Sequence, residues 1–193
     1  MGPVLHNFRR TVAANIDLRL LERRDAEPIF AAVERDREYL RQWLPWVDRT
    51  ESAQHVRAFI EEVVIPQWSD NRGPQCGIWV DGELAGSVGC HPIDWANRLC
   101  SIGYWVESRR QGQGIVSRSV STMLNYLFEE ECLHRVVIQC ATGNVRSCAI
   151  PLRLGFVQEG VLREAELVGG RWLDLVTWGM LEQEWRQRTQ AAS

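Results

Sequence analysis

Two glycines separate an apolar stretch from a long amphipathic one in Gly103-Tyr104-Trp105-Val106-Glu107-Ser108-Arg109-Arg110-Gln111-Gly112-Gln113-Gly114-Ile115-Val116. The apolar stretch ends a predicted strand over 99–106, and the periodicity that follows predicts a helix over about 113–131. Glycine lets backbone N–H groups approach a ligand closely, and the first N–H groups of a helix have no partner within it. The helix dipole adds partial positive charge there, so this strand–loop–helix is suited to binding a phosphate or diphosphate.

Two other phosphate-binding motifs do not match this segment. A Walker loop needs Gly-Lys followed by Ser or Thr, and the segment contains no lysine. A dinucleotide-binding fingerprint needs a third glycine at the position of Ser117. On spacing alone, an ordinary strand–helix turn remains the alternative to a phosphate site.

Hydrophobic periodicity predicts alternating strands and helices along the rest of the chain, with no internal repeat or linker. Strands are expected at about 16–20, 76–80, 84–90, 135–140, 156–168 and 172–181, and further helices at about 25–40, 50–66 and 144–154. Asp81-Gly82 and Gly169-Gly170 are typical of the tight turns that join antiparallel strands. The pattern predicts one mixed α/β domain over residues 1–193, with Arg9-Arg10 in a solvated stretch before its first strand.

The composition is that of an ordinary globular protein and gives no indication of a nucleic-acid partner, a membrane span or a metal site. The 193 residues are 45% hydrophobic and 24% charged, with a net charge of −3 and no basic cluster, so nucleic acid is not an expected partner. No apolar run is long enough to span a membrane. The six cysteines lack C-x-x-C pairs and zinc-like spacing with the four histidines, so we expect no metal site and reduced thiols in a cytoplasmic protein.

The glycine-bearing segment resembles the acetyl-CoA signature of the GNAT acetyltransferase family. Arg109-x-x-Gly112-x-Gly114 is similar to the family's Q/R-x-x-G-x-G/A motif, in the same strand–loop–helix setting. Asn144-x-x-Ser147 and the later Leu154-Gly155-Phe156 resemble the helix and strand that follow in that family. The resemblance implies a twisted central sheet, mixed but mostly antiparallel, with helices on both faces.

Four shorter segments resemble the RimL/RimJ branch, which acetylates the N-terminal serine or alanine of ribosomal proteins. They are Ile102 to Val106, Gln111 to Ile115, Arg41 to Trp46, and Phe156-x-x-Glu159-Gly160. The likeness spans about residues 15–185 and is more specific to fold and cofactor than to substrate. It also implies a homodimer, because related proteins are often dimers.

The resemblance assigns acetyl-CoA binding to one continuous region and one later helix. Backbone groups of Trp105 and Val106 would pair with the pantetheine arm, the amides from Gln111 to Val116 would hold the pyrophosphate, and Asn144 and Ser147 would meet the sulfur end. The complete set of implied cofactor residues is Trp105, Val106, Arg109, Gln111, Gly112, Gln113, Gly114, Ile115, Val116, Asn144 and Ser147.

The resemblance also implies two catalytic residues. Ser147 would assist the CoA thiolate, and Glu166 would act as the base for an α-amino group, whose pKa of about 8 requires only a modest base. Ser147 has the alternative role of a helix cap. Glu164 is the alternative base, because alternation along a strand would place it on the same face as Glu166. Asp174, on the partner strand, would orient a substrate amine or pair with an arginine, and we favour a structural role.

Two features depart from the family's pattern. Many members have a tyrosine late in the short helix as general acid, whereas Tyr39, Tyr104 and Tyr126 all lie elsewhere in this chain. Pro151 falls inside that predicted helix, removes a backbone hydrogen bond, and would kink the helix and move Ser147.

An aromatic cluster precedes the cofactor region, in the part of the chain that forms one wall of the acceptor cleft in this family. Trp43, Trp46 and Trp68 are its members, and ordinary helix packing is the alternative for each of them. The sequence therefore predicts an acetyl-CoA-dependent N-acetyltransferase whose acceptor is a protein N-terminus. A small-molecule amine acetyltransferase, for example of an antibiotic or polyamine, and a catalytically silent acyl-CoA-binding module are the alternatives.

Overall fold

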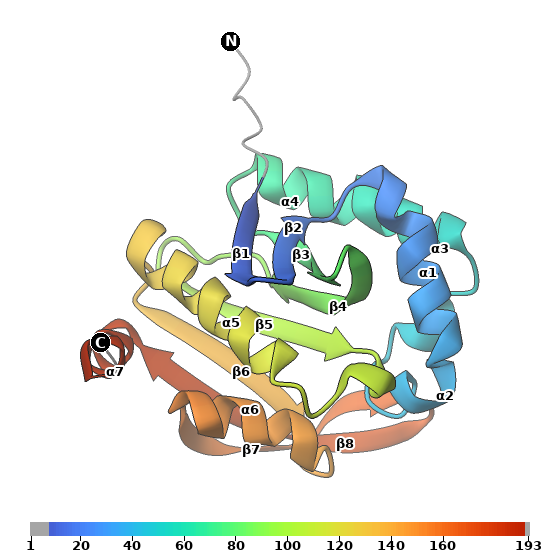
Figure 1. The fold of residues 1–193 in the computed structure, drawn as a ribbon. Helices are drawn as coiled ribbons and strands as arrows, with labels where there is room; N and C mark the ends of the chain where they lie inside the picture. The colour runs from blue at the N-terminus through green and yellow to red at the C-terminus, as the bar shows by residue number, and fades with distance from the viewer. Residues whose placement is uncertain (1–7, 192–193) are drawn as a thin grey trace.

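A computed structural model describes residues 8–191 as one open sheet with helices packed on it (Figure 1). Within residues 8–191, eight strands lie in the order β1-β2-β3-β4-β5-β6-β8-β7, and of the neighbouring pairs only β5 and β6 run parallel. The strands are β1 (Arg9–Ala13), β2 (Ile16–Leu20), β3 (Gln75–Val80), β4 (Glu83–Cys90), β5 (Leu99–Val106), β6 (Arg135–Ala141), β7 (Val157–Val168) and β8 (Arg171–Leu181). The predicted mixed, mostly antiparallel α/β fold is confirmed.

Helices α1 to α4 precede β3, and α5 and α6 follow β5 and β6. Their bounds are α1 (Ala26–Arg35), α2 (Arg37–Leu40), α3 (Ala53–Phe59), α4 (Ile65–Ser69), α5 (Ile115–Asn125), α6 (Val145–Leu154) and α7 (Glu182–Ala191). Short 3₁₀ turns lie at Arg23–Asp25, Val47–Arg49 and Ser108–Arg110, and π turns extend α3 and α5 over Ile60–Val64 and Tyr126–Glu130.

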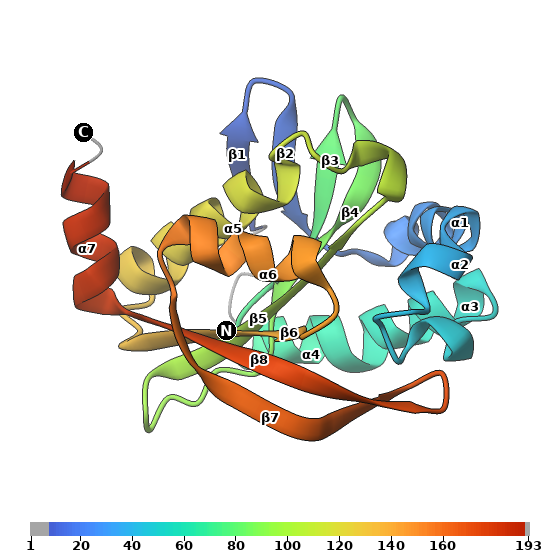
Figure 2. The same ribbon diagram turned by 90° about the horizontal axis from the view of Figure 1, so that it is seen from below.

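The sheet separates two hydrophobic cores. Ile78 and Trp79 are consecutive in β3 and therefore point to opposite faces. Ile78 packs in a core that includes Leu124 of α5, whereas Trp79 packs in a second core that includes Ile29 of α1. Helices thus cover both faces of the sheet, with α5 and α6 on one face and α1 to α4 on the other (Figures 1 and 2).

The stretch containing Arg9-Arg10 forms the edge strand β1, so the prediction of a solvated stretch before the first strand was wrong about the strand and about Arg10, although Arg9 is exposed. β1 pairs antiparallel with β2, and Leu20 donates its N–H to the carbonyl of Phe8. The Arg10 guanidinium stacks over the Phe8 and Tyr126 rings and pairs with Glu130 at 2.6 Å. These cation–π contacts hold the charged Arg10 side chain against two aromatic rings. The sequence pattern, which predicted a solvated arginine, does not indicate such a contact.

Two long helices are interrupted where the sequence predicted continuous ones. The helix expected over 25–40 breaks at Asp36, between α1 and α2. The helix expected over 50–66 begins after Ser52, whose side chain accepts the N–H of His55. It widens into a π turn just before Pro66, which lies in the first turn of α4. The Ile65 N–H still bonds to the Ile60 carbonyl in the π turn, so the chain remains helical up to Pro66, which has no N–H to pair.

Candidate active site

A cavity of about 520 Å³ opens between α2, the end of β5, the start of α5 and one side of α6. Its lining comes from two separate stretches of the chain, 39–44 on one wall and 104–153 on the other. Among the lining residues are nine of the predicted cofactor residues: Trp105, Val106, Gln111, Gly112, Gly114, Ile115, Val116, Asn144 and Ser147. The structure therefore brings most of the predicted set together around one space.

The two parallel strands separate beside this cavity. Pairing between β5 and β6 ends at Ile102 and Ile138, although β5 continues to Val106 and β6 to Ala141. Over this last part, β5 keeps its pairing with β4 on the other edge, up to Val106 opposite Gly86. One edge of the Trp105 and Val106 backbone is thus free of a neighbouring strand and faces the opening, where the sequence predicts binding of an extended amide chain.

The start of α5 presents free N–H groups to the same cavity. Gly112 and Gly114 adopt φ of 73° and 71°, a left-handed conformation that suits glycine. Arg118 donates its N–H to the Gly114 carbonyl at 3.1 Å, so the N–H groups of Ile115 to Ser117 precede the first hydrogen bond within the helix. These N–H groups and the helix dipole favour an anion at this position.

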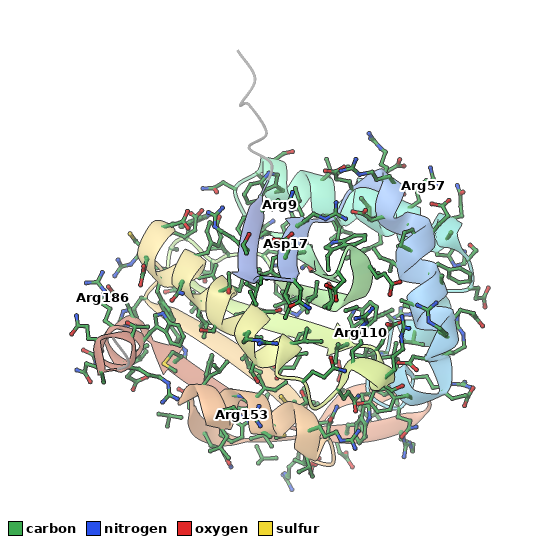
Figure 3. All side chains as sticks on the ribbon, in the orientation of Figure 1. Arg9, Asp17, Arg57, Arg110, Arg153 and Arg186 are labelled. Carbon is green, nitrogen blue, oxygen red and sulfur yellow. The ribbon has the colours of Figure 1, made fainter. Side chains whose placement is uncertain are left out.

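Arginines add positive charge around the anion-binding end. Arg110, Arg146 and Arg153 line the cavity, and Figure 3 labels Arg110 before α5 and Arg153 on α6. Arg146 bonds to Gln111, and Arg153 bonds to the Ser117 hydroxyl at 3.0 Å, so α6 is tied to the start of α5 by two side chains. Sequence reasoning missed Arg146 and Arg153, although their spacing of seven residues on one helix places them on a common face.

Arg109 and Gln113, predicted to bind the cofactor, lie outside the cavity lining. The Arg109 Nε donates to Glu107 at 2.9 Å, and the Gln113 amide donates to the Arg109 carbonyl at 3.3 Å. Glu107 is only 1% exposed and also accepts from Arg35. In this structure Arg109 therefore helps to satisfy a buried carboxylate that fixes the loop, because an unpaired buried charge is costly.

Ser147 lies in the first turn of α6 without capping it. The cap is Asn144, whose side-chain oxygen accepts the Ser147 N–H at 3.1 Å. The Ser147 hydroxyl lies 3.2 Å from Cys140 Sγ and 3.4 Å from the Tyr104 hydroxyl. The local fold thus leaves this hydroxyl available for chemistry at the cavity wall, rather than using it at the helix end.

Tyr104 is a site residue that the sequence did not predict. It lines the cavity from β5, and its hydroxyl donates to the Ser147 carbonyl at 3.1 Å. Burial raises the pKa of Tyr104 well above its usual 10.0, and the nearby Cys140 thiol raises it further. Burial likewise raises the pKa of Cys140, so both groups stay protonated and neutral at physiological pH.

Glu166 lies on the hairpin of β7 and β8, and it is not among the described residues that line the cavity. Burial raises the pKa of Glu166 above its usual 4.5. The regular alternation of side chains along a strand, which would place Glu164 and Glu166 on one face, is broken between these two residues. The φ of Glu164 is 48°, and a bulge sets Leu162 to Glu166 against only Leu175 to Leu173.

Asp174 stabilises this bulge. Its Oδ1 accepts the Glu164 N–H at 2.8 Å, and the Asp174 carbonyl accepts the N–H of Thr142. The favoured structural role of Asp174 therefore matches its contacts, with a backbone amide as its partner instead of an arginine.

The three tryptophans predicted near the acceptor have different surroundings. Trp43 lines the cavity and lies beside Gly143. Trp46 packs against Trp105 beside the core that includes Ile29, with ring centroids 6.1 Å apart. Trp68 packs edge-on against Phe8 in the core that includes Leu124. Only Trp43 of these three therefore lies where it can contact a bound molecule in the cavity.

Comparisons with known proteins agree with this geometry. A family model described as an acetyltransferase (GNAT) domain matches residues 15–157. The chain belongs to the GNAT acetyltransferase family. This GNAT chain is 36% identical over 182 residues to the putative ribosomal N-acetyltransferase YdaF of Bacillus subtilis (strain 168), covering 92% of this chain and 97% of that protein. It is 28% identical over 167 residues to the ribosomal-protein-serine acetyltransferase of Escherichia coli (strain K12), covering 85% and 91% of the two chains.

A solved structure extends the comparison to a bound cofactor. The microcin C7 self-immunity acetyltransferase MccE, in complex with acetyl-CoA and AMP, matches with a TM-score of 0.82 and 27% identity, covering 88% of this chain and 94% of that chain. The resemblance to the RimL/RimJ branch is confirmed by the relatives, and the GNAT chain is an acyltransferase.

The cavity of this GNAT enzyme fits an extended anionic cofactor. Its volume lies within the range of small-molecule sites, about 300–1,000 Å³. The free N–H groups of α5 and the arginines at one end suit phosphates, and the separated strands at the other end offer unpaired backbone groups. Over residues 8–191 no helix is long and apolar enough to cross a membrane. The same part of the chain has no cluster of three His, Cys, Asp or Glu side chains that could hold a metal ion.

Proposed function

We propose that this GNAT enzyme transfers the acetyl group of acetyl-CoA to the α-amino group of a protein N-terminus, such as that of a ribosomal protein. One observation supports this most: the free N–H groups of α5 and the unpaired ends of β5 and β6 lie at the same cavity. Two relatives named as ribosomal acetyltransferases, each aligned over most of the chain, support the choice of acceptor.

Acetyl-CoA supplies an acetyl group activated as a thioester. The N–H groups of Ile115 to Ser117 would hold its diphosphate, aided by Arg110, Arg146 and Arg153. The free edge of Trp105 and Val106 would pair with the amides of the pantetheine arm, as a further strand pairs with a sheet edge.

The two proposed catalytic groups differ in their proton chemistry. Glu166 accepts a proton from the ammonium form of the acceptor, directly or through water, and its raised pKa brings it closer to the pKa of an α-amino group. The Ser147 hydroxyl donates a hydrogen bond to the departing sulfur. Because the structure sets Glu166 outside the cavity lining, we propose that the bound acceptor lies between the β7–β8 hairpin and the cavity mouth.

A small-molecule amine is the second candidate acceptor. Tyr39 and Trp43 line the cavity beside the cofactor wall, and aromatic rings can stack on a planar ligand. The related MccE structure holds AMP together with acetyl-CoA, which supports this alternative. We also retain the expectation of a cytoplasmic homodimer, which light scattering tests for the oligomeric state.

Acceptor profiling by mass spectrometry separates the candidates. The purified enzyme is incubated with acetyl-CoA and peptides starting with serine or alanine, with the same peptides carrying a blocked N-terminus, and with a panel of polyamines and aminonucleosides. Acetylation of the free peptides alone is the expected result. Acetylation of the small amines alone would replace the first candidate with the second. Calorimetric binding of CoA without turnover of any amine would favour a silent acyl-CoA-binding module.

A further inference from the structure

Pro151 leaves one backbone carbonyl of α6 without its usual partner. In an α-helix the N–H of residue 151 would bond to the carbonyl of Ser147, four residues earlier. Proline has no N–H, and its ring pushes that carbonyl aside. The helix nevertheless continues through Pro151 to Leu154, so the carbonyl of Ser147 needs a donor from elsewhere.

Tyr104 supplies that donor from the neighbouring strand. Its hydroxyl lies 3.1 Å from the Ser147 carbonyl, although the two residues are 43 positions apart in the chain. A hydroxyl has one proton, so donation to the carbonyl leaves the lone pairs of the Tyr104 oxygen as acceptors. The Ser147 hydroxyl lies 3.4 Å from this oxygen and 3.2 Å from Cys140 Sγ, so its single proton can go to either neighbour in the free protein and to a sulfur atom bound in the cavity during transfer. A single tyrosine thus contacts both the backbone and the side chain of Ser147.

The protonation state of Tyr104 keeps this arrangement constant. Its partly buried hydroxyl has a raised pKa, so it remains a donor throughout the physiological range. The Cys140 thiol, which contacts both the Ser147 and the Tyr104 hydroxyls, is also neutral, because burial raises its pKa. Neither neighbour is therefore a strong base that would take the Ser147 proton.

We propose that Tyr104 and Pro151 act together as a positioning pair for Ser147: the proline frees the carbonyl, and the tyrosine binds it and so fixes the hydroxyl at the cavity wall. Tyr104 is a positioning residue in this proposal and does not itself donate a proton to the reactants. The proposal rests on the proposed role of Ser147 in acetyl transfer. It also reverses the expectation that Pro151 disturbs the site.

A double-mutant cycle on the full chain tests the pair. Tyr104→Phe should lower kcat about tenfold, the loss of roughly one hydrogen bond, while the KM for acetyl-CoA stays within about twofold. Pro151→Ala should keep most of the activity, because an N–H at position 151 can bond to the Ser147 carbonyl. In the Pro151→Ala background, Tyr104→Phe should then lower kcat less than about threefold. An equal loss in both backgrounds would overturn the proposal, since Tyr104 would then act independently of Pro151.

Tyr126→Phe is the matched control. Tyr126 is also buried, its pKa is also raised, and its hydroxyl bonds to Glu131. It is not among the described residues that line the cavity. It should lower the urea midpoint without lowering kcat. If Tyr104→Phe behaves in the same way, the tyrosine has only a structural role and the positioning proposal fails.

Ser147→Ala separates this proposal from the proposed function. If that change leaves kcat unaltered, the catalytic role of Ser147 fails. Coupling between Tyr104→Phe and Pro151→Ala in urea unfolding would still show that the pair binds the carbonyl. Absence of coupling in unfolding would overturn the pair itself, whatever the effect of Ser147→Ala.

Discussion

Replacing Gly114 with alanine tests whether the start of α5 binds the diphosphate of acetyl-CoA. Gly114 has φ of 71°, and a Cβ added there would meet no atom within 4 Å. The cost to the free protein therefore comes from the backbone alone, about 1–2 kcal/mol for an L-residue in the left-handed region. The loop can relieve this strain only by changing φ, which would turn the first N–H groups of α5 away from the cavity.

The effect on cofactor binding follows from those N–H groups. A hydrogen bond to a charged group contributes about 1.5–3 kcal/mol, so loss of one such bond raises the Kd for CoA about tenfold or more. Gly82→Ala is the matched control, because Gly82 has φ of 80°, has no atom within 4 Å of its added Cβ, and lies in the turn between β3 and β4. Both variants should lose a similar free energy of unfolding in urea.

Calorimetric titration with CoA distinguishes the two glycines. We expect weaker binding for Gly114→Ala and unchanged binding for Gly82→Ala. Equal Kd values for the two variants, measured at equal loss of stability, would refute the assignment of the diphosphate to the start of α5.

Three further changes test other parts of the site. Burial raises the folded-state pKa of Glu166 above 4.5, so its ionised form opposes folding as the pH rises through that pKa. Glu166→Gln should therefore raise the urea midpoint at pH 7 but not near about pH 4. In the pH profile of kcat/KM, the same change should remove the fall in rate toward acidic pH. If that fall is unchanged, the base is another residue. Glu107→Gln should lower the free energy of unfolding by about 2 kcal/mol in urea, because the buried carboxylate accepts from several arginines; a loss under about 0.5 kcal/mol would contradict this. Trp43→Ala should raise the KM for the acceptor more than that for acetyl-CoA in steady-state assays, and the opposite ranking would place Trp43 on the cofactor side.

The parts of the fold that the sequence predicts well are those set by local chemistry. Asp81-Gly82 and Gly169-Gly170 form the two hairpin turns with positive φ, which few other residue pairs adopt easily. The missed elements are polar: β1 is an edge strand that begins with one exposed and one half-buried arginine, and α7 buries only Trp185. Such elements are stabilised by their contacts with the rest of the protein, so their own periodicity is weak.

The candidate site divides in the same way. Most of the predicted cofactor region is one strand, loop and helix, and its geometry follows from two glycines and a helix start. The contact between Tyr104 and Ser147 depends on how β5 meets α6, which local pattern does not encode. The bulge that carries Glu164 breaks the alternation from which a face shared with Glu166 was inferred. Bulges of this kind re-aim side chains near sites and have no strong sequence signature.

The two walls of the cavity come from distant stretches of the chain, 39–44 and 104–153. The residues proposed to hold acetyl-CoA all belong to the longer stretch, whereas the shorter one lines the cavity with aromatic and aliphatic side chains from α2 and the loop after it. Leu40 is buried in the second core, whereas Tyr39 and Trp43 are less buried and can be changed with less risk to the packing of the helices. A compact library at these positions is therefore a practical starting point for redirecting the enzyme to new amines.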